Sequence, residues 1–186
     1  MMKNLFDEYL RLSESVRRGY VATLGQPDPV ALSVLEEAVG GEVPALLQTI
    51  YTTVEGTNVN EVEDSLFDFI PGFQLIHLHD WAKEYRLLKE EFGKDFLPVL
   101  AGEEGAYYAL DAATGEVLIL FLDEFKLQDV IFEDAEHFLQ TIIANYNEKV
   151  YFVDEDGWLD FDDDEEVRVA RRLNPNVSYW EEGWGG

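Results

Sequence analysis

Three short apolar runs follow one another in the middle of the chain, separated only by short linkers. They are FLPVL at residues 96–100, AYYAL at 106–110 and EVLILFL at 116–122. The linkers are AGEEG and DAATG, and the second ends in Gly115, the residue type that best tolerates the positive φ of a tight turn. This pattern predicts a β-meander. Because EVLILFL is apolar almost throughout, we expect it to form a central strand with both faces covered.

Apolar residues at helical spacing predict a first helix, and they are Leu5, Tyr9, Leu12, Val16 and Tyr20. The segment GQPDP at residues 25–29 breaks that helix. Later helices are expected at four places: with Asp28 as N-cap, from Pro44 to Gly56, with Asp80 as N-cap, and over residues 133–147. The segment LFDFIPGFQLIHL, residues 66–78, predicts two short extended pieces around Pro71-Gly72.

These elements predict an α+β fold in one domain, with a mainly antiparallel sheet backed by several helices. The 186 residues, 47% of them apolar, suffice for one domain with a substantial core. We expect residues 1–27 to form an N-terminal helix, and residues 148–186 to form an acidic C-terminal extension packed on the domain.

Charge limits the classes of partner. The formal net charge is −26, from 39 acidic against 13 basic residues. Such a chain is not expected to bind nucleic acid or anionic lipid through a broad surface, whereas a basic protein partner, or simple solubility, fits. No cysteine is present, so disulfides and thiolate sites are excluded. The N-terminus does not read as a signal peptide and no run approaches 18 apolar residues, so we expect a cytoplasmic protein that spans no membrane.

The densest acidic stretch is FVDEDGWLDFDDDEE, residues 152–166, with nine carboxylates in its last 13 positions. An EF-hand register with Gly157 at position 6 places Phe152, which cannot ligate, at position 1, and Asp163 at position 12, where Glu is wanted. A regular calcium loop is therefore not predicted. Weak, irregular binding of a divalent cation stays open.

Turn and cap chemistry explains about half of these carboxylates. Asp156-Gly157 is a turn dipeptide between KVYFV and WLDF, which predicts a hairpin. Asp162 and Glu165 have capping-box spacing for a helix over residues 163–173, within which Asp164 can pair with Arg168. The surplus acids, with aromatic residues among them, suit docking of a basic protein.

The predicted partner-binding residues are Trp158, Asp160, Phe161, Asp162, Asp163, Asp164, Glu165, Glu166, Tyr179 and Trp180. For Tyr179 and Trp180 the alternative is a C-terminal tail that simply folds onto the domain. Both interpretations stay open at this point.

Two histidines form the other candidate site. His77 and His79 alternate with apolar residues, so on a strand both imidazoles would face one side, where Asp80 or His137 could complete a metal site. A polar strand face beside a helix cap is the simpler interpretation. No nucleophile elbow, zinc-protease, P-loop or dinucleotide motif is present. We therefore expect no catalytic residue, no metal and no cofactor.

The order of elements resembles the SUKH superfamily, the Smi/Knr-type domain. Three segments carry the resemblance, which spans roughly residues 28–180: VGGEVPALLQTIYTTVEGT, FLPVLAGEEGAYYALDAATGEVLIL and LNPNVSYW. Glu55 stands where members often carry Asn before the glycine. The resemblance implies an α+β fold and a non-enzymatic role. Many bacterial members resemble immunity proteins that neutralise a toxin, often a nuclease, and others are interaction modules.

The sequence thus predicts a protein-binding domain of immunity type, which would occlude the basic surface of a toxin. A regulatory or scaffold module is the alternative within the same class. A metal-dependent hydrolase is the alternative from another class.

Overall fold

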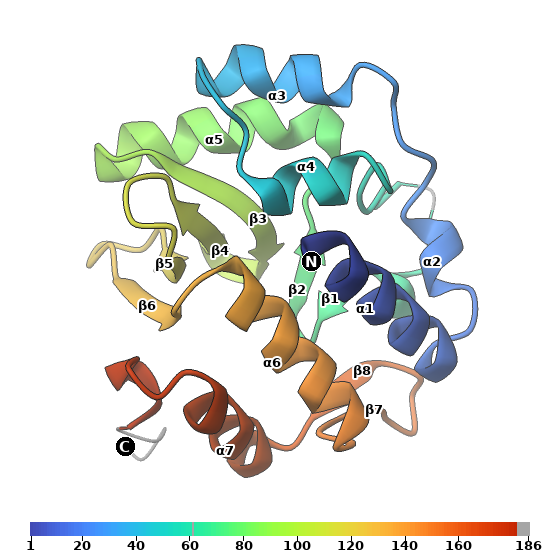
Figure 1. Cartoon of the computed structure of the whole chain (residues 1–186). Helices are drawn as coiled ribbons and strands as arrows, with labels where there is room; N and C mark the ends of the chain where they lie inside the picture. Colours follow the sequence, from blue (N-terminus) through green and yellow to red (C-terminus); the bar gives the residue numbers. More distant parts are fainter. Residues whose placement is uncertain (61, 182–186) are drawn as a thin grey trace.

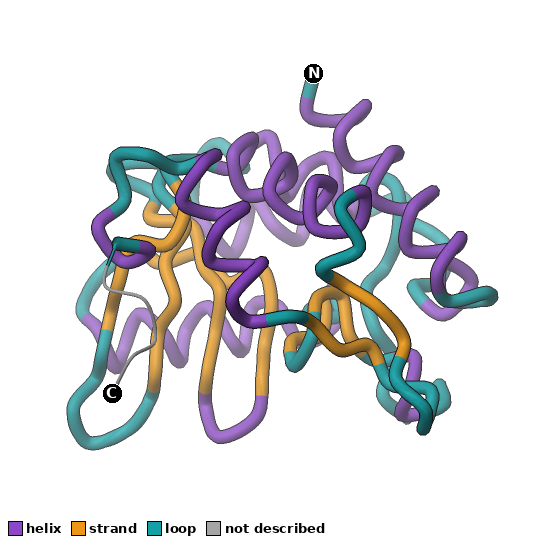
Figure 2. Tube along the Cα trace, turned by 90° about the horizontal axis from the view of Figure 1, so that it is seen from below, coloured by secondary structure: helices purple, strands orange, loops and turns teal. Residues whose placement is uncertain are grey.

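The computed structural model describes residues 1–60 and 62–181 of the chain. Its centre is a six-stranded antiparallel sheet whose strands lie in the order of the chain (Figure 1). The strands are β1 (Asp68–Ile70), β2 (Phe73–Leu75), β3 (Phe96–Gly102), β4 (Ala106–Asp111), β5 (Val117–Phe121) and β6 (Gln128–Phe132). Figure 2 shows them side by side. Short turns and loops join neighbouring strands, except that residues 76–95 between β2 and β3 include a helix. The predicted meander is confirmed as β3–β5. Strand β6 was not predicted from the sequence.

Helices and a small second sheet surround this sheet. Among the described residues the α-helices are α1 (Met2–Val16), α2 (Tyr20–Thr23), α3 (Ala31–Val39), α4 (Ala45–Tyr51), α5 (Leu78–Phe92), α6 (Ala135–Asn147) and α7 (Asp163–Leu173). Single 3-10 turns are η1 (Asp64–Leu66), η2 (Glu103–Gly105) and η3 (Ser178–Trp180). The second sheet is the hairpin of β7 (Tyr151–Val153) and β8 (Leu159–Phe161). The α+β fold in a single domain, with an antiparallel sheet backed by helices, is therefore confirmed.

Helices cover both faces of the sheet. On one face lies α5, where the Trp81 indole donates a 2.8 Å hydrogen bond to the carbonyl of Pro98 in β3. On the other face lies α6, where the Phe138 ring contacts the rings of Tyr108 and Phe132, with centroids 6.2 and 5.3 Å apart. Val117 to Leu120 of β5 are consequently buried, as the apolar character of EVLILFL predicts.

The N-terminal helix closes the α6 side of the core. The Tyr9 ring stacks on Phe69 of β1 with centroids 4.1 Å apart, and its hydroxyl donates a 2.8 Å hydrogen bond to the Phe69 carbonyl. One side chain thus contributes both apolar burial and a partner for a buried backbone group.

The first helix ends earlier than predicted. It stops at Val16, where the next residue, Arg17, already has a non-helical φ of −126°. Gly19 then has a φ of 92°, and the Glu14 carboxylate accepts the N–H groups of Gly19 and Val21 at 2.8 and 3.0 Å. That carboxylate starts the separate short helix α2. The predicted single helix through Tyr20 is therefore wrong.

Other boundaries also differ from the predictions. The helix after Pro44 ends at Tyr51 rather than Gly56, and α3 begins at Ala31, three residues beyond Asp28. Asp28 accepts the N–H of Val30 at 2.9 Å, so it stabilises the turn before α3 instead of capping the helix. Local signals identified the helices but not their ends.

Gly56 lies where two segments cross. Its φ is 108°, and a Cβ atom at this position would come within 2.5 Å of the Ile76 carbonyl oxygen. The Thr57 N–H donates to the Leu75 carbonyl beside it at 3.1 Å. Only glycine permits both this backbone conformation and this approach.

The acidic C-terminal extension folds mainly as turn and cap chemistry predicts. Asp154 accepts the N–H groups of Asp156 and Trp158 in the β7–β8 turn, at 2.9 and 2.8 Å. Asp162 caps α7 by accepting the N–H of Glu165 at 3.1 Å. The hairpin and the helix cap are confirmed.

One predicted ion pair is wrong. Arg168 contacts Glu165 at 2.7 Å and Glu148 at 2.8 Å, rather than Asp164. Glu148 ends α6 and also pairs with Arg172, so these ion pairs hold α7 against α6.

No helix in the described ranges combines the length and the apolar character that crossing a bilayer requires.

A candidate protein-binding groove

A groove with a volume of about 1120 Å³ lies between the α6-side face of the sheet and the segment that runs from β8 through α7 to η3. The sheet side consists of Ile70, Pro71, Phe73, Tyr108, Ile119 and Phe121. The opposite side consists of Phe161, Asp162, Asp163, Asp164, Glu166, Val167, Arg171, Tyr179 and Trp180. We call this feature the acidic groove. Its residues come from elements that Figure 1 labels β1, β2, β4, β5, β8 and α7, and from the segment after α7.

The period of the strands explains its apolar floor. Tyr108 of β4 pairs directly with Ile119 of β5, so their side chains project to the same face of the sheet. The Phe73 ring from β2 contacts the Tyr108 ring with centroids 4.5 Å apart. Strands β2, β4 and β5 thus build one largely aromatic surface, although β2 is distant from the other two in the sequence.

The start of α7 supplies the acidic rim. Asp162 is held as the N-cap, and Asp163 and Asp164 follow in the first helical turn, where all three side chains are exposed. Negative charge is favourable at a helix N-terminus, so these carboxylates can gather here at little cost to folding. The same charges remain available to a cationic partner.

Seven of the ten predicted partner-binding residues line the acidic groove: Phe161, Asp162, Asp163, Asp164, Glu166, Tyr179 and Trp180. The other three lie outside it. Trp158 is 42% exposed beside the hairpin turn, Asp160 is exposed on β8, and Glu165 turns towards Arg168.

Trp180 lines the groove, but its side chain is packed into the domain and does not protrude. It is only 5% exposed, packs against Phe132, and its indole N–H donates a 2.6 Å hydrogen bond to the Ile131 carbonyl. The folded-tail interpretation therefore describes its main contacts. Tyr179, which is half-buried, stands with its ring perpendicular to that of Trp180.

Glu166 is the most unusual charged group of the groove. The Tyr151 hydroxyl donates a 3.0 Å hydrogen bond to its carboxylate. Burial nevertheless raises the pKa of Glu166 to about 7, and the negative charge of Asp163 adds to this effect. The neighbouring cations are engaged elsewhere, because Arg168 contacts Glu148 and Arg171 donates to the Trp180 carbonyl at 2.6 Å.

A second groove continues the first along the sheet edge. It has a volume of about 840 Å³, runs beside β6, and shares Phe121 and Tyr179 with the acidic groove. Asp129 and Glu133 add further negative charge to its lining. The two grooves together therefore form one continuous, negatively charged depression on this side of the molecule.

The aromatic floor of the acidic groove was not predicted from the sequence. Phe73, Tyr108 and Phe121 sit in short apolar runs whose neighbours look the same, and no local signal distinguishes the residues facing the groove. Only the pairing register of the sheet brings them together.

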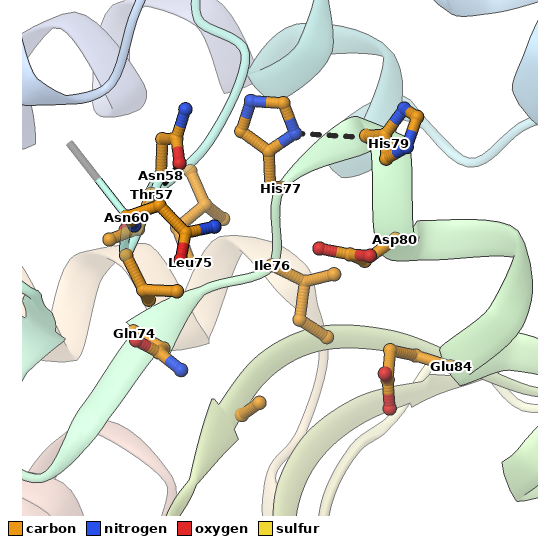
Figure 3. Close-up of a pocket in the computed structure, with 12 residues that line it drawn as sticks. Thr57, Asn58, Asn60, Gln74, Leu75, Ile76, His77, His79, Asp80 and Glu84 are labelled. Carbon is orange, nitrogen blue, oxygen red and sulfur yellow. Dashed lines mark hydrogen bonds between the residues drawn. The ribbon is translucent and has the colours of Figure 1, made fainter.

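The two histidines line a separate pocket of about 370 Å³, shown in Figure 3. They do not share a strand face as predicted, because β2 ends at Leu75 and α5 begins at Leu78. His77 is instead the N-cap of α5, and its Nδ1 accepts the His79 N–H at 3.2 Å.

His77 therefore has a structural role as a helix cap. The Nε2 atom of His77 lies 3.6 Å from Glu55, while His137 lies on α6 beside Asp134. Asp80, the predicted cap, is in the first turn of α5. Within residues 1–60 and 62–181, no three His, Asp or Glu side chains are grouped so that they could hold a metal ion.

Comparison with known proteins adds no relative. No protein-family model matches the sequence. No curated protein matches it significantly either. The SUKH resemblance therefore depends on the quoted segments and on the order of elements.

Proposed function

We propose that this protein is a non-enzymatic binding domain of SUKH type that acts as an immunity protein. Its partner is a basic toxin domain, for example a nuclease, and the mechanism is occlusion of the toxin's nucleic-acid-binding surface. The acidic groove carries this proposal, because an aromatic floor and an acidic rim occur together in one concave surface.

The two parts of the groove have different roles in binding. The rim of Asp162, Asp163 and Asp164 attracts a basic surface and speeds encounter. The floor of Phe73, Tyr108 and Phe121 is apolar area that a partner can cover, which slows release. A net charge of −26 extends the attraction over the whole molecule.

The fold supports this role through rigidity. The floor belongs to central strands, and the rim is fixed by the Asp162 cap and by the ion pairs between α7 and Glu148. A groove built on such elements changes little on binding, which limits the entropy lost in the complex.

The experiment is affinity capture from the cells that make the protein, followed by assay of the captured partner. We expect a basic protein whose toxic activity falls to background at a one-to-one ratio with this protein. A captured basic protein that keeps its full activity would show a scaffold instead. Capture of no basic protein from cells that express the neighbouring genes would contradict the proposal.

A further inference from the structure

We infer that the part of the acidic groove lined by Tyr108, Glu166 and Tyr179 is the seat for a single arginine or lysine side chain of the partner. This inference rests on the proposed function and deepens it. It specifies which contact on the groove is cation-specific and which chemical group fills it.

This part of the groove combines one carboxylate with two aromatic side chains. Glu166 is held in place by the Tyr151 hydroxyl at 3.0 Å, and all three residues of the seat line the groove. Burial is the main cause of the raised pKa values of Tyr108 and Tyr179, and the negative charge of nearby Glu166 adds to both.

This combination is chemically selective. A carboxylate gives charge-assisted hydrogen bonds to a guanidinium or an ammonium group, and aromatic faces attract the same cations. Arginine fits best, because its planar group can bond a carboxylate at its edge while its face stacks on a ring. A neutral polar side chain would gain neither the charge nor the cation–π attraction.

Within the described part of the chain Glu166 forms no ion pair, and its hydrogen bond comes from the Tyr151 hydroxyl. Arg171, the cation that also lines the groove, donates to the carbonyls of Trp180 and Glu181. Glu166 is thus a half-buried carboxylate whose ionisation is opposed by burial. A cation from another molecule would favour the ionised form, which links binding to release of a proton.

The test uses small probes and needs no identified partner. N-acetyl-arginine amide is titrated into the protein, and N-acetyl-citrulline amide serves as its neutral isostere. The readout is the carboxyl carbon shift of Glu166 in NMR, followed from pH 5 to pH 9. With saturating arginine probe the midpoint of the Glu166 titration should move down by at least half a pH unit, and with citrulline it should not move.

Affinity gives the second readout. Binding of the arginine probe should be roughly five- to tenfold tighter at pH 8 than at pH 6, because Glu166 is mostly ionised only at the higher pH. Glu166→Gln should weaken probe binding at pH 8 about tenfold and abolish this pH dependence. Glu155→Gln, an exposed change on the β7–β8 turn, should retain wild-type binding.

Two outcomes would overturn the inference: equal responses to the arginine and citrulline probes, or unchanged arginine binding by Glu166→Gln. Either leaves the wider proposal to be judged by affinity capture, which does not depend on the probes. Conversely, an arginine response without any basic partner in the cell would preserve the seat and contradict the immunity role.

Discussion

The hydroxyl of Tyr151 donates a 3.0 Å hydrogen bond to the carboxylate of Glu166, and this contact joins the β7–β8 hairpin to the first turn of α7. The bond favours the ionised carboxylate, but burial opposes ionisation more strongly, so the pKa of Glu166 rises to about 7. Carboxylates in grooves whose pKa is raised in this way are enriched at functional sites.

Glu166 should lower stability at alkaline pH. Its pKa is higher in the folded state than in the unfolded chain, so the folded state binds the proton more tightly and stability falls as pH rises from about 4.5 through about 7. We expect Glu166→Gln to be more stable than wild type at pH 8, by on the order of 1–3 kcal/mol, and similar at pH 4.5. Urea unfolding at both pH values measures this. An equal difference at both would show that Glu166 does not titrate as described.

Glu148 should show the opposite pH dependence. Hydrogen bonds from Arg172 and Arg168 lower its pKa to about 2, so its contribution is present above about pH 4.5 and is lost as pH falls towards 2. Because the pair is near the surface, we expect Glu148→Gln to cost only about 0.5–1 kcal/mol at pH 7. The difference from wild type in urea unfolding should shrink at pH 2.5. A pH-independent cost would indicate lost packing instead.

Gly56 should tolerate no side chain. Gly56→Ala places a Cβ atom 2.5 Å from the Ile76 carbonyl oxygen in a left-handed conformation, and we expect a loss of about 3 kcal/mol or more. Gly40→Ala is the matched control, since its φ is 73° and a Cβ there meets nothing within 4 Å. That variant should lose only about 1–2 kcal/mol. Equal losses in thermal unfolding would mean that the close approach is unimportant.

Trp180 should stabilise the domain through one hydrogen bond. Trp180→Phe keeps an aromatic ring against Phe132 but leaves the Ile131 carbonyl without its indole donor. We expect a loss of about 1–3 kcal/mol in urea unfolding. Trp158→Phe, at a site 42% exposed, should change stability by less than about 0.5 kcal/mol. Similar effects of the two changes would contradict a folded, hydrogen-bonded C-terminal segment.

Local signals in the sequence predicted local structure well. The meander follows from apolar runs and a turn glycine, and the Asp162 cap follows from its spacing to Glu165. The acidic rim of the groove could therefore be located from sequence. Exact boundaries could not, because contacts such as the Glu14 carboxylate with the Gly19 N–H decide where a helix ends.

The floor of the groove depends on long-range pairing. Tyr108 faces the groove and Tyr107 faces α5, where its hydroxyl donates to Glu84, although the two are neighbours of the same type. The direction of each follows from the strand register, which no local pattern specifies. The prediction that His77 and His79 share a strand face is wrong for a different reason, because the strand expected at His77 ends two residues earlier.

The central claim is that the acidic groove receives a basic protein. It is tested most directly by the association rate of the captured partner with three proteins: wild type, the groove variant and a control. The groove variant is Asp162→Asn, Asp163→Asn and Asp164→Asn together, in which Asn can still cap α7. The control is Glu36→Gln, Glu37→Gln and Glu42→Gln, an equal change in charge in and just after α3, far from α7 (Figure 1).

At low ionic strength we expect the groove variant to associate at least tenfold more slowly than wild type, with a weaker dependence on salt. The control should associate within about twofold of wild type. Equal slowing of both variants would show that net charge, and not the acidic groove, sets the association rate. Unchanged association of the groove variant would contradict the account.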